Sequence, residues 1–589
     1  MVGGASLDLI HVDGRPVPTP GGAGLYTALA AARAGVDVTM LAPVPDPMPA
    51  ELAPVRSRIT WVGPTVDLDG LPRFEIAYDA AGAVTFFREH LGAEPDMLPA
   101  LLDMLADLPE CAYCVPFLDA RLQQSFIRAL AARGCLTVAA TYGKAARTET
   151  AVVRATVDLV DLFFCNDDEA SVLFGDDADI CASPGRLRFV TRGPGGVTVL
   201  QGDHRTDLAA VPVVALDPTG AGDTFCGTTV ARLLLGDHPV EAARWGTAAA
   251  AAMVAHVGPT ALWPAGPPPS PTVDERVVLD HAVVDRMAAL LTGLDDLDPF
   301  AFTGDLFPGV GDGDAIDWFT AATLQQYGFW HDRNGRYDRP MIARIDGITR
   351  KGSDYLWAQY RREHAADPSS MRPAAQGATT ADAWHAAAVD DDGRDPYPDS
   401  DQRVASAIAY GRTLGALEFD APTLVAAANG TPRPMRALLR LLDHVGGYRE
   451  DPLRKKAALL GVILRQRPER LLHDADDDDA PPIVDYHVQR TSLRTGMVSV
   501  VDGPLRRRLE RRELLPAPDE HAVRRATFAA VAHLAATSGR PMGAVDWFLF
   551  QMRHRCPEMS SPECMQCPAV PACNRRIELF QPVLRTTSY

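Results

Sequence analysis

The stretch Asp217-Pro-Thr-Gly-Ala-Gly-Asp-Thr-Phe225 says most about the fold of this 589-residue chain. It follows the strand-like run 211–216 (VPVVAL) and opens the helical run 227–236 (GTTVARLLLG). Glycines at a strand-to-helix turn leave backbone N–H groups free to surround an anion at the helix N-terminus. An aspartate in that turn can take the proton of an attacking hydroxyl group. The stretch therefore predicts phosphoryl transfer, which needs charge stabilisation beside an oriented nucleophile.

Outward from this stretch, residues 1–260 alternate short apolar runs with helical stretches. The helical run 25–35 (LYTALAAARAG) precedes the apolar run 36–43 (VDVTMLAP), and 125–134 (SFIRALAARG) precedes 135–143 (CLTVAATYG). This is the β-α rhythm of a parallel sheet covered by helices on both faces. The pattern predicts a three-layer α/β domain.

A proline-rich segment separates this half from the rest of the chain. The run 258–271 (GPTALWPAGPPPSP) holds too many prolines for a helix or a central strand and is typical of a linker. Beyond it the apolar residues recur with helical spacing. We predict an α/β domain over 1–262, a linker over 263–274 and an all-α domain over 275–589.

Composition and charge limit the classes of function. Hydrophobic residues make up 47% of the chain, and the formal net charge is −19 with both halves acidic. Proteins that grip a nucleic acid backbone usually present a basic face, so the balance favours a small substrate and leaves nucleic acid as an alternative. No apolar run reaches the roughly 18 residues of a membrane span. We expect a cytoplasmic protein without a membrane partner, and solvated loops at the acidic stretches 390–401 and 474–479.

The cysteines divide into two groups. Ten cysteines without a secretory signal argue against a disulfide framework. Four of them form the spacing Cys556-x7-Cys564-x2-Cys567-x5-Cys573 near the end of the chain. Four thiolates in one short loop can converge on a [4Fe–4S] cluster or on zinc. We expect the cluster, with zinc as the alternative.

The first half resembles the ribokinase-type (PfkB) carbohydrate and nucleoside kinases. The C-terminal signature of that family is matched at Asp217–Asp223. The resemblance implies ATP and Mg²⁺ as cofactors, Asp223 as the catalytic base, and a possible homodimer through the kinase domain. It also implies an anion hole formed by Gly220, Ala221 and Gly222.

Other motifs of the same family follow in order. Asn166-Asp-Asp-Glu169 matches its Asn-x-x-Glu motif, 190–197 (VTRGPGGV) matches its nucleotide-side strand and turn, and Gly21-Gly22 matches its double glycine. Tyr26 departs from the Asn that the family commonly has, which puts the sugar in doubt. The resemblance implies cofactor-binding roles for Asn166, Glu169, Thr191 and Gly193, and substrate-binding roles for Asp8, Gly21 and Gly22.

The second half carries a segment that resembles the DNA glycosylases of the endonuclease III type. Their cysteine loop has x6 in its first gap, and 484–490 (VDYHVQR) is similar to their Val-Asp-Thr-His segment with a following Arg. A carboxylate beside the sugar–base bond can stabilise an oxocarbenium-like sugar and orient water. The resemblance implies that Asp485 is the catalytic carboxylate; a helix-capping aspartate is the alternative.

The DNA clamp of that superfamily is not matched. Its Gly-x-Gly turn is absent from 451–457 (DPLRKKA), where Lys455 is either a lyase lysine or one of a basic pair on a helix face.

The queuosine 5′-phosphate N-glycosylases, helical relatives that cleave a free nucleotide, are a closer resemblance. It is carried by the ordered segments 316–319 (IDWF), 329–330 (FW), 351–354 (KGSD), 447–451 (GYRED) and 485–486 (DY). It implies that Phe329 and Trp330 stack on the base and that Tyr486 binds the substrate, although the cysteine loop is not expected in that family.

The two halves suggest one combined activity. A nucleoside kinase makes a 5′-monophosphate, and a glycosylase that recognises the phosphate releases the base. We therefore predict a bifunctional nucleoside kinase and nucleotide N-glycosidase that acts on a queuosine-like or other 7-deazapurine nucleoside. The alternatives are a DNA base-excision or base-modification glycosylase fused to a sugar kinase, and a kinase with a non-catalytic iron–sulfur module.

Overall fold

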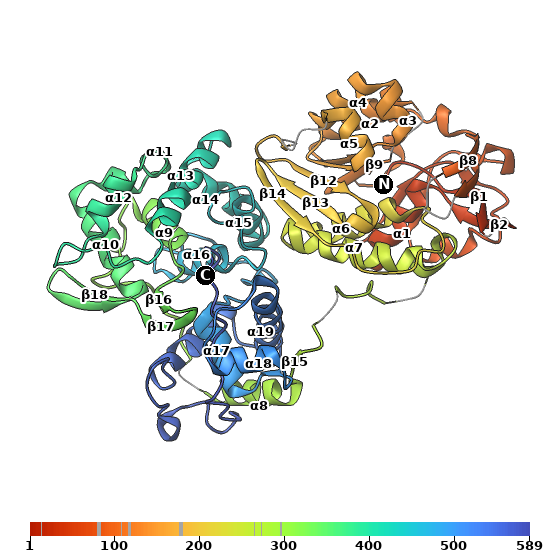
Figure 1. Cartoon of the computed structure of the whole chain (residues 1–589). Coiled ribbons are helices and arrows are strands. Elements are labelled where there is room, and N and C mark those ends of the chain that lie inside the picture. Colours follow the sequence, from red (N-terminus) through yellow and green to blue (C-terminus); the bar gives the residue numbers. More distant parts are fainter. Residues whose placement is uncertain are drawn as a thin grey trace. The chain divides into compact units, whose positions relative to one another are not determined.

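The computed structural model divides the chain into two compact units, Met1–Thr272 and Val273–Tyr589 (Figure 1). Part of the predicted linker 263–274, namely 264–265 and 272–273, lies outside the described residues. In the part of the chain that the structure describes, no helix is both long and apolar enough to cross a membrane. The described residues are 1–12, 15–78, 84–107, 109–115, 119–175, 181–263, 266–271, 274–294 and 297–589.

A six-stranded sheet forms the centre of the first unit. Its order is β14-β13-β12-β11-β10-β9, in which β9 to β12 run parallel and β13 and β14 are antiparallel additions at one edge. Parallel strands place their carboxyl ends at one edge of the sheet, where α/β proteins bind ligands. The strands are β9 (Cys111–Cys114), β10 (Leu136–Ala140), β11 (Leu162–Asn166), β12 (Leu187–Thr191), β13 (Val197–Gln201) and β14 (His204–Leu208).

Helices cover both faces of this sheet, which confirms the three-layer prediction (Figure 1). Phe163 and Phe164 are neighbours on β11, yet Phe163 belongs to the core under α2 and α5 and Phe164 to the core under α6 and α7. Neighbouring residues of a strand point to opposite faces, so a sheet buried on both sides needs apolar residues throughout. The helices are α1 (Ala23–Arg33), α2 (Ala120–Ala131), α3 (Gly143–Thr148), α4 (Thr150–Val157), α5 (Asp167–Phe174), α6 (Ala221–Leu234) and α7 (Pro239–Val254).

A second, four-stranded sheet lies in the same unit. Its order is β2-β1-β7-β8, and β1 pairs antiparallel with β2 and parallel with β7. The predicted strand at 211–216 is wrong, because these residues form no strand and Val214 is 89% exposed. Among the described residues, β14 is the edge strand of the six-stranded sheet, and the apolar residues 211–216 do not pair with it or with another strand. The strands are β1 (Ser6–Val12), β2 (Arg15–Gly21), β7 (Arg73–Tyr78) and β8 (Val84–His90), with short pairs β3 (Thr39–Leu41) with β5 (Thr60–Val62) and β4 (Val44–Pro45) with β6 (Thr65–Val66).

The second unit is largely helical, and the all-α prediction is corrected by three two-stranded sheets. These sheets are β15 (Val277–Leu279) with β20 (Val498–Val500), β16 (Trp330–Arg333) with β17 (Arg336–Pro340), and β18 (Ile342–Ile345) with β19 (Ile348–Lys351). The helices are α8 (His281–Thr292), α9 (Ala315–Leu324), α10 (Ser353–Ala366), α11 (Pro373–Gly377), α12 (Ala381–Ala388), α13 (Ser400–Ala416), α14 (Ala421–Asn429), α15 (Pro434–Leu442), α16 (Lys455–Gln466), α17 (Tyr486–Thr495), α18 (Pro504–Glu510), α19 (Ala517–Ser538) and α20 (Met542–Gln551).

Helix α17 is buried along its whole length although its sequence, YHVQRTSLRT, is mostly polar. Buried polar groups need partners inside the protein. Arg490 Nη1 donates to Gln581 Oε1 at 2.6 Å, and Arg494 Nε donates to the carbonyl oxygen of Leu579 at 2.9 Å. These contacts fix α17 in the interior, and with it the residue at its N-cap, Asp485.

The acidic stretch 474–479 is a loop with most of its carboxylates exposed, as its composition predicts, and Asp478 is the exception. Asp478 is buried, accepts the N–H groups of Met435 and Arg436 at the start of α15, and pairs with Arg465 at 3.0 Å. Asp479 accepts the N–H of Met542 at the start of α20 at 2.7 Å. The two carboxylates therefore satisfy orphan N–H groups at two helix N-termini.

An ion pair between Arg524 and Asp451 lies in the core of this unit. Arg524 donates to both carboxylate oxygens, at 2.7 and 2.8 Å, and both side chains are almost fully buried. Burial alone would raise the pKa of Asp451, but the Arg524 guanidinium outweighs it and holds that pKa below its usual value. Asp451 also accepts the N–H of Lys455 at 2.7 Å and thereby fixes the start of α16.

We expect Arg524→Met to lower the free energy of unfolding of this unit by about 3–5 kcal/mol, because it leaves a buried carboxylate unpaired. The matched control is Arg394→Met, which breaks an exposed 3.7 Å pair with Asp392 and should cost less than about 1 kcal/mol. Urea unfolding followed by tryptophan fluorescence measures both, because most of the eight tryptophans lie in this unit. Equal losses in the two variants would contradict the prediction.

Candidate active sites

The first candidate site is a cavity of about 420 Å³ in the N-terminal unit. The strand ends Ala140, Asn166 and Thr191 of the central sheet line one side of it. Residues of the four-stranded sheet, among them Asp8 and Phe74, line another side. The cavity therefore lies at the carboxyl edge of the parallel strands, where this architecture binds ligands.

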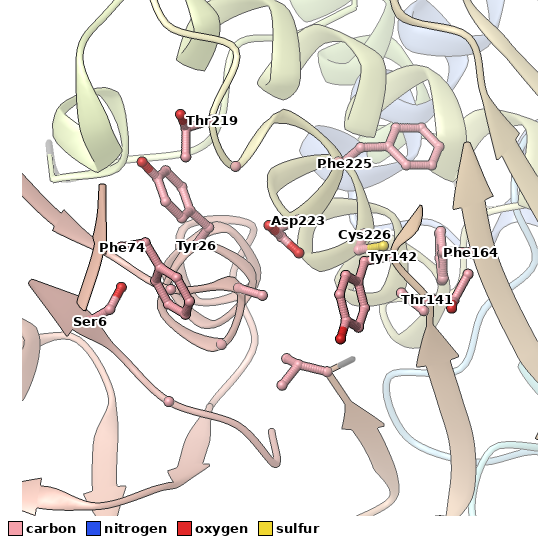
Figure 2. Close-up of a pocket in the computed structure, with 18 of the residues that line it drawn as sticks. Ser6, Tyr26, Phe74, Thr141, Tyr142, Phe164, Thr219, Asp223, Phe225 and Cys226 are labelled. Carbon is pink, nitrogen blue, oxygen red and sulfur yellow. The ribbon is translucent and has the colours of Figure 1, made fainter. Parts of the chain in front are cut away.

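Asp223, in the first turn of α6, points into this cavity between Tyr26 and Phe74 on one side and Tyr142 on the other (Figure 2). Burial, and secondarily the negative charge of Glu169, raise the pKa of Asp223 to about 7. A carboxyl group with a pKa near 7 is matched to taking up a proton at neutral pH. The structure thus places the predicted base where a substrate hydroxyl group can reach it.

The glycine turn before α6 has the shape needed for an anion. Gly220 is in the left-handed region with φ 76°, and a Cβ there would lie 2.4 Å from the ring of Tyr26, so only glycine fits. Gly222 faces open space in the cavity. Ala221 does not line the cavity, and its N–H already donates to the carbonyl oxygen of Pro218. Of the three predicted anion-hole residues, two therefore face the site.

Asp217, the first residue of the signature, holds this turn in place. It is fully buried, and its carboxylate accepts the N–H of Thr219 at 2.9 Å and that of Gly258 at 2.8 Å. The hydroxyl of Thr219 is 2.8 Å from that of Tyr78 on β7. These bonds connect the glycine turn to both the helical layer and the four-stranded sheet.

Asn166 and Glu169 form a capping box at the start of α5. Asn166 Oδ1 accepts the N–H of Glu169 at 2.8 Å, and Glu169 Oε2 accepts the N–H of Asn166 at 2.9 Å. Both residues line the cavity, and burial raises the pKa of Glu169 to about 7. Carboxylate and amide oxygens are ligands that Mg²⁺ accepts, usually together with water and substrate phosphates. The donor set therefore fits that ion.

The double glycine makes room for Asp8. A Cβ at Gly21 would overlap the carboxylate of Asp8, at 1.7 Å from Oδ2, and Gly22 has φ 96°. Asp8 Oδ1 accepts the N–H of Phe74 at 3.1 Å, and burial raises the pKa of Asp8 to about 7. Gly21 itself does not line the cavity, whereas Gly22 and Asp8 do.

On the nucleotide side, Thr191 lines the cavity but Gly193 does not. Gly193 lies in an exposed turn with φ 51°.

Sequence patterns gave no role to Tyr142, yet its ring borders the cavity opposite Tyr26 (Figure 2). Nothing in the local sequence distinguishes Tyr142 from a core aromatic residue.

The second candidate site is a cavity of about 310 Å³ inside the C-terminal unit. Asp485 lines it and also caps α17, because its Oδ1 accepts the N–H of Val488 at 2.8 Å. The helix-capping interpretation of this aspartate is therefore confirmed, and its catalytic role stays a prediction for a residue that borders the cavity. The aromatic wall consists of Phe300, Phe302, Phe307, Tyr327, Phe329, Trp357, Tyr486, Trp547, Phe550 and Tyr589.

Two of the three aromatic residues predicted to contact the substrate line this cavity. They are Phe329 and Tyr486. Trp330 is a correction: it does not line the cavity, and its ring lies under the Arg585 guanidinium at 3.8 Å and against Tyr337 at 5.6 Å, in a buried cluster that also contains Tyr486. Of the pair Phe329 and Trp330, only Phe329 therefore borders the cavity.

Cationic and acidic groups surround the same space. Lys455 Nζ donates to the carbonyl oxygen of Gln326 at 2.7 Å, and burial lowers the pKa of Lys455. Arg553 lies over the ring of Phe550 at 3.5 Å. Asp546, which no sequence motif singled out, also lines the cavity. Apolar walls with a few convergent charged groups are typical of a small-molecule site.

The four C-terminal cysteines line one small cavity beside α17. Arg494 Nη1 lies 3.3 Å from Cys556 Sγ, and the N–H of Arg575 donates to Cys573 Sγ at 3.3 Å. A tetrahedral zinc ion with Zn–S bonds of about 2.3 Å needs sulfurs about 3.8 Å apart. Within the described residues, three or more metal-ligand atoms that all lie within 4.8 Å of one another occur at Asp312, Asp314 and His364, and not among the cysteines. The structure therefore brings the four thiols to one cavity but shows no metal centre among these four described cysteines.

Comparison with known proteins bears on the N-terminal unit. Residues 125–266 match the pfkB family carbohydrate kinases. A cytidine kinase of Thermococcus kodakarensis is 27% identical over 249 residues, which cover 38% of this chain and 85% of that protein. The bifunctional protein HldE of a Caulobacter species is 32% identical over 121 residues, 19% of this chain and 23% of that protein.

Among solved structures, the Burkholderia thailandensis nucleoside kinase in complex with inosine is similar, with 19% identity and a TM-score of 0.37 over 45% of this chain and 93% of that one. The adenosine kinase from Sinorhizobium meliloti has 21% identity and a TM-score of 0.37 over 44% and 94%. The family match, together with the geometry around Asp223, supports a phosphotransferase domain in the N-terminal unit, namely a kinase domain of the pfkB type.

We expect Asp223→Asn to lower the kinase rate by about 10²–10⁴-fold, because asparagine cannot take the proton of the attacking hydroxyl. In the unchanged protein kcat/KM should fall as pH drops through about 7, where Asp223 becomes protonated. Asp103→Asn, at an exposed ion pair with Arg133, is the matched control and should keep the full rate. ADP release with a panel of nucleosides measures both, and a fully active Asp223→Asn would contradict the assignment.

Proposed function

We propose that this chain phosphorylates a nucleoside at one site and hydrolyses the N-glycosidic bond of the resulting 5′-monophosphate at the other. The observation that supports the second step is the position of Asp485. It borders a cavity that also holds aromatic side chains for a base and cationic side chains for a phosphate. A bare structural aspartate at a helix start would require none of these groups.

In the kinase step, Asp8 binds hydroxyl groups of the sugar, and Asp223 takes the proton of the hydroxyl that attacks the γ-phosphate of ATP. The free N–H groups of the turn at Gly220 and Gly222 stabilise the charge that develops on the transferred phosphate. Asn166 and Glu169 would hold Mg²⁺, which neutralises phosphate charge when bound. The similarity to a cytidine kinase supports a nucleoside as the substrate class.

In the hydrolytic step, Phe329 and Tyr486 hold the base, since aromatic faces stack on planar rings. Asp485 stabilises the positive charge that develops on the oxocarbenium-like sugar, and it orients the attacking water. Arg553 provides positive charge for the 5′-phosphate at the start of α10, beside Lys351, whose Nζ is paired with the buried Glu558 at 2.6 Å. The resemblance to the queuosine 5′-phosphate N-glycosylases makes queuosine or another 7-deazapurine the leading candidate for the base.

The two steps support each other chemically. Phosphorylation adds a charged group far from the bond that breaks, and binding of that group can position the sugar–base bond against Asp485. The net result is conversion of a nucleoside into a free base and ribose 5-phosphate at the expense of one ATP.

A DNA glycosylase fused to a sugar kinase is the second candidate, favoured by the buried Lys455 in the same cavity.

We further propose a [4Fe–4S] cluster held by Cys556, Cys564, Cys567 and Cys573. The shared cavity and the N–H donors to two of the sulfurs support such a cluster. It would fix the cysteine loop beside α17, where Arg494 of that helix already donates to the carbonyl oxygen of Pro557. No step of the proposed reaction passes through it.

The coupling is tested by incubating the protein with ATP, Mg²⁺ and a panel of purine and 7-deazapurine nucleosides. We expect free base only when ATP is present, and free base without ATP when the 5′-monophosphate is supplied. Asp223→Asn should block the first reaction and leave the second intact, while Asp485→Asn should block both and leave ADP release intact. Base release that is equally fast from nucleosides without ATP would show that the steps are not coupled, and duplex DNA binding with glycosylase activity would favour the second candidate.

The cluster is tested by the visible spectrum of protein purified without oxygen. We expect a broad brown absorption with about four iron atoms per chain, because four thiolates bind one [4Fe–4S] cluster. Cys564→Ser should lose the absorption, whereas Cys181→Ser, at an exposed cysteine of the other unit, should keep it. A colourless protein that contains zinc would contradict the cluster.

A further inference from the structure

Asp546 and Asp485 border the same cavity from two different helices. Asp485 stands at the N-cap of α17, and Asp546 lies within α20. Trp547 and Phe550 of α20 line the cavity beside Asp546, and Trp547 stacks on Phe300 with ring centroids 4.5 Å apart. The start of α20 is held by Asp479, which fixes the helix against the rest of the unit. Asp546 therefore has a defined position in the wall of the site.

The surroundings of the two carboxyl groups differ. Asp485 Oδ1 accepts the N–H of Val488 at the N-terminus of α17 at 2.8 Å. Burial first, and then the charge of Asp485, raise the pKa of Asp546 to about 8, and Lys455 and Arg553 only partly offset this. The titratable and charged groups around the cavity are Asp485, Tyr486 and His487 of α17, Lys455 of α16, Lys351 of β19, Asp354 of α10, Tyr327, Tyr589, and Arg553 and His554 of the short helix Met552–His554.

A comparison with Asp451 shows that burial in this unit does not by itself produce a protonated carboxyl group. Asp451 is also buried, but Arg524 binds both of its oxygens and its pKa is lowered. For Asp546, burial and the charge of Asp485 outweigh the nearby cations Lys455 and Arg553. A carboxyl group with a raised pKa that shares one cavity with a second carboxyl group is the arrangement that glycoside cleavage uses.

The other groups in the cavity are less suited to donate a proton. His487 accepts from Arg490 at 3.0 Å through Nδ1, and burial and that guanidinium lower its pKa well below the usual value, so it stays neutral. Burial raises the pKa of Tyr486 far above the usual value. Lys455 is held by the carbonyl oxygen of Gln326.

We propose that Asp546 is a catalytic acid that protonates the departing base, while Asp485 acts as the carboxylate that supports the sugar and receives the proton of water. This inference rests on the proposed N-glycosidase function. The bond between C1′ and the base nitrogen breaks, and its electron pair leaves with the base. Asp546 gives its proton to the base, the oxygen of water bonds to C1′, and the water proton passes to Asp485. The products are the neutral base and ribose 5-phosphate; Asp485 then releases its proton to solvent, and solvent returns one to Asp546.

The test compares two leaving groups. The first is the base of 7-deazaguanosine or guanosine 5′-monophosphate, and the second is 4-nitrophenolate from 4-nitrophenyl ribofuranoside 5-phosphate, which leaves without being protonated. We expect Asp546→Asn to lose about 10²–10⁴-fold in kcat on the nucleotide and less than about tenfold on the nitrophenyl compound. Asp485→Asn should lose activity on both. Asp285→Asn, at an exposed carboxylate bonded to His533, should match the unchanged protein.

The pH profile of the unchanged protein gives a readout that needs no variant. A carboxyl group with a raised pKa is a proton donor below that pKa, so kcat/KM on the nucleotide should fall tenfold per pH unit above about 8. The fall should be absent on the nitrophenyl compound and absent from the residual activity of Asp546→Asn.

Three results would overturn the inference. Asp546→Asn could keep the full rate on the nucleotide, lose the same factor on both compounds with a lowered melting temperature, or retain the fall above pH 8. In each case Asp546 is at most a structural residue while base release by the unchanged protein still stands. If the unchanged protein releases neither base nor 4-nitrophenol, the proposed N-glycosidase function itself fails, and the inference fails with it.

Discussion

A carboxyl group in a protein interior costs free energy when it is charged, because it loses water that no neighbouring cation replaces. Asp8, Asp223 and Asp546 all border cavities, and burial raises the pKa of each into the range of about 7 to 8. Such groups lower stability at neutral pH, since the folded state holds protons that the unfolded chain has already released. A fold that keeps three of them must be held together by other interactions.

Those other interactions are the paired carboxylates of the same chain. Asp217 fixes the glycine turn through two backbone N–H groups, and Asp451 binds Arg524 in the core of the second unit. In the first unit Asp217 thereby supports the turn that precedes Asp223, and in the second Asp479 holds the start of the helix that carries Asp546. The division between structural and reactive carboxyl groups follows from their partners and not from their residue type.

Each unit contains its own cavity, and in the proposed function the product of the first is the substrate of the second. The first brings together a glycine turn, two oxygen ligands and a base of tuned pKa, which together suit transfer of a phosphate to a hydroxyl group. The second combines aromatic walls with cations and a pair of carboxyl groups. A phosphate made in the first would supply the charge that the cations of the second can bind.

The sequence by itself determined the three-layer sheet and the glycine turn, because strand alternation and turn geometry depend on residues that are close along the chain. It also brought Asp223, Asn166, Asp8 and Asp485 to attention as members of local motifs. The tertiary structure alone decided that Trp330 faces away from the cavity, that Asp478 caps a helix, and that residues 211–216 form no strand. It alone placed Asp546 beside Asp485, because a pKa and a shared cavity arise from contacts between helices that are distant in sequence.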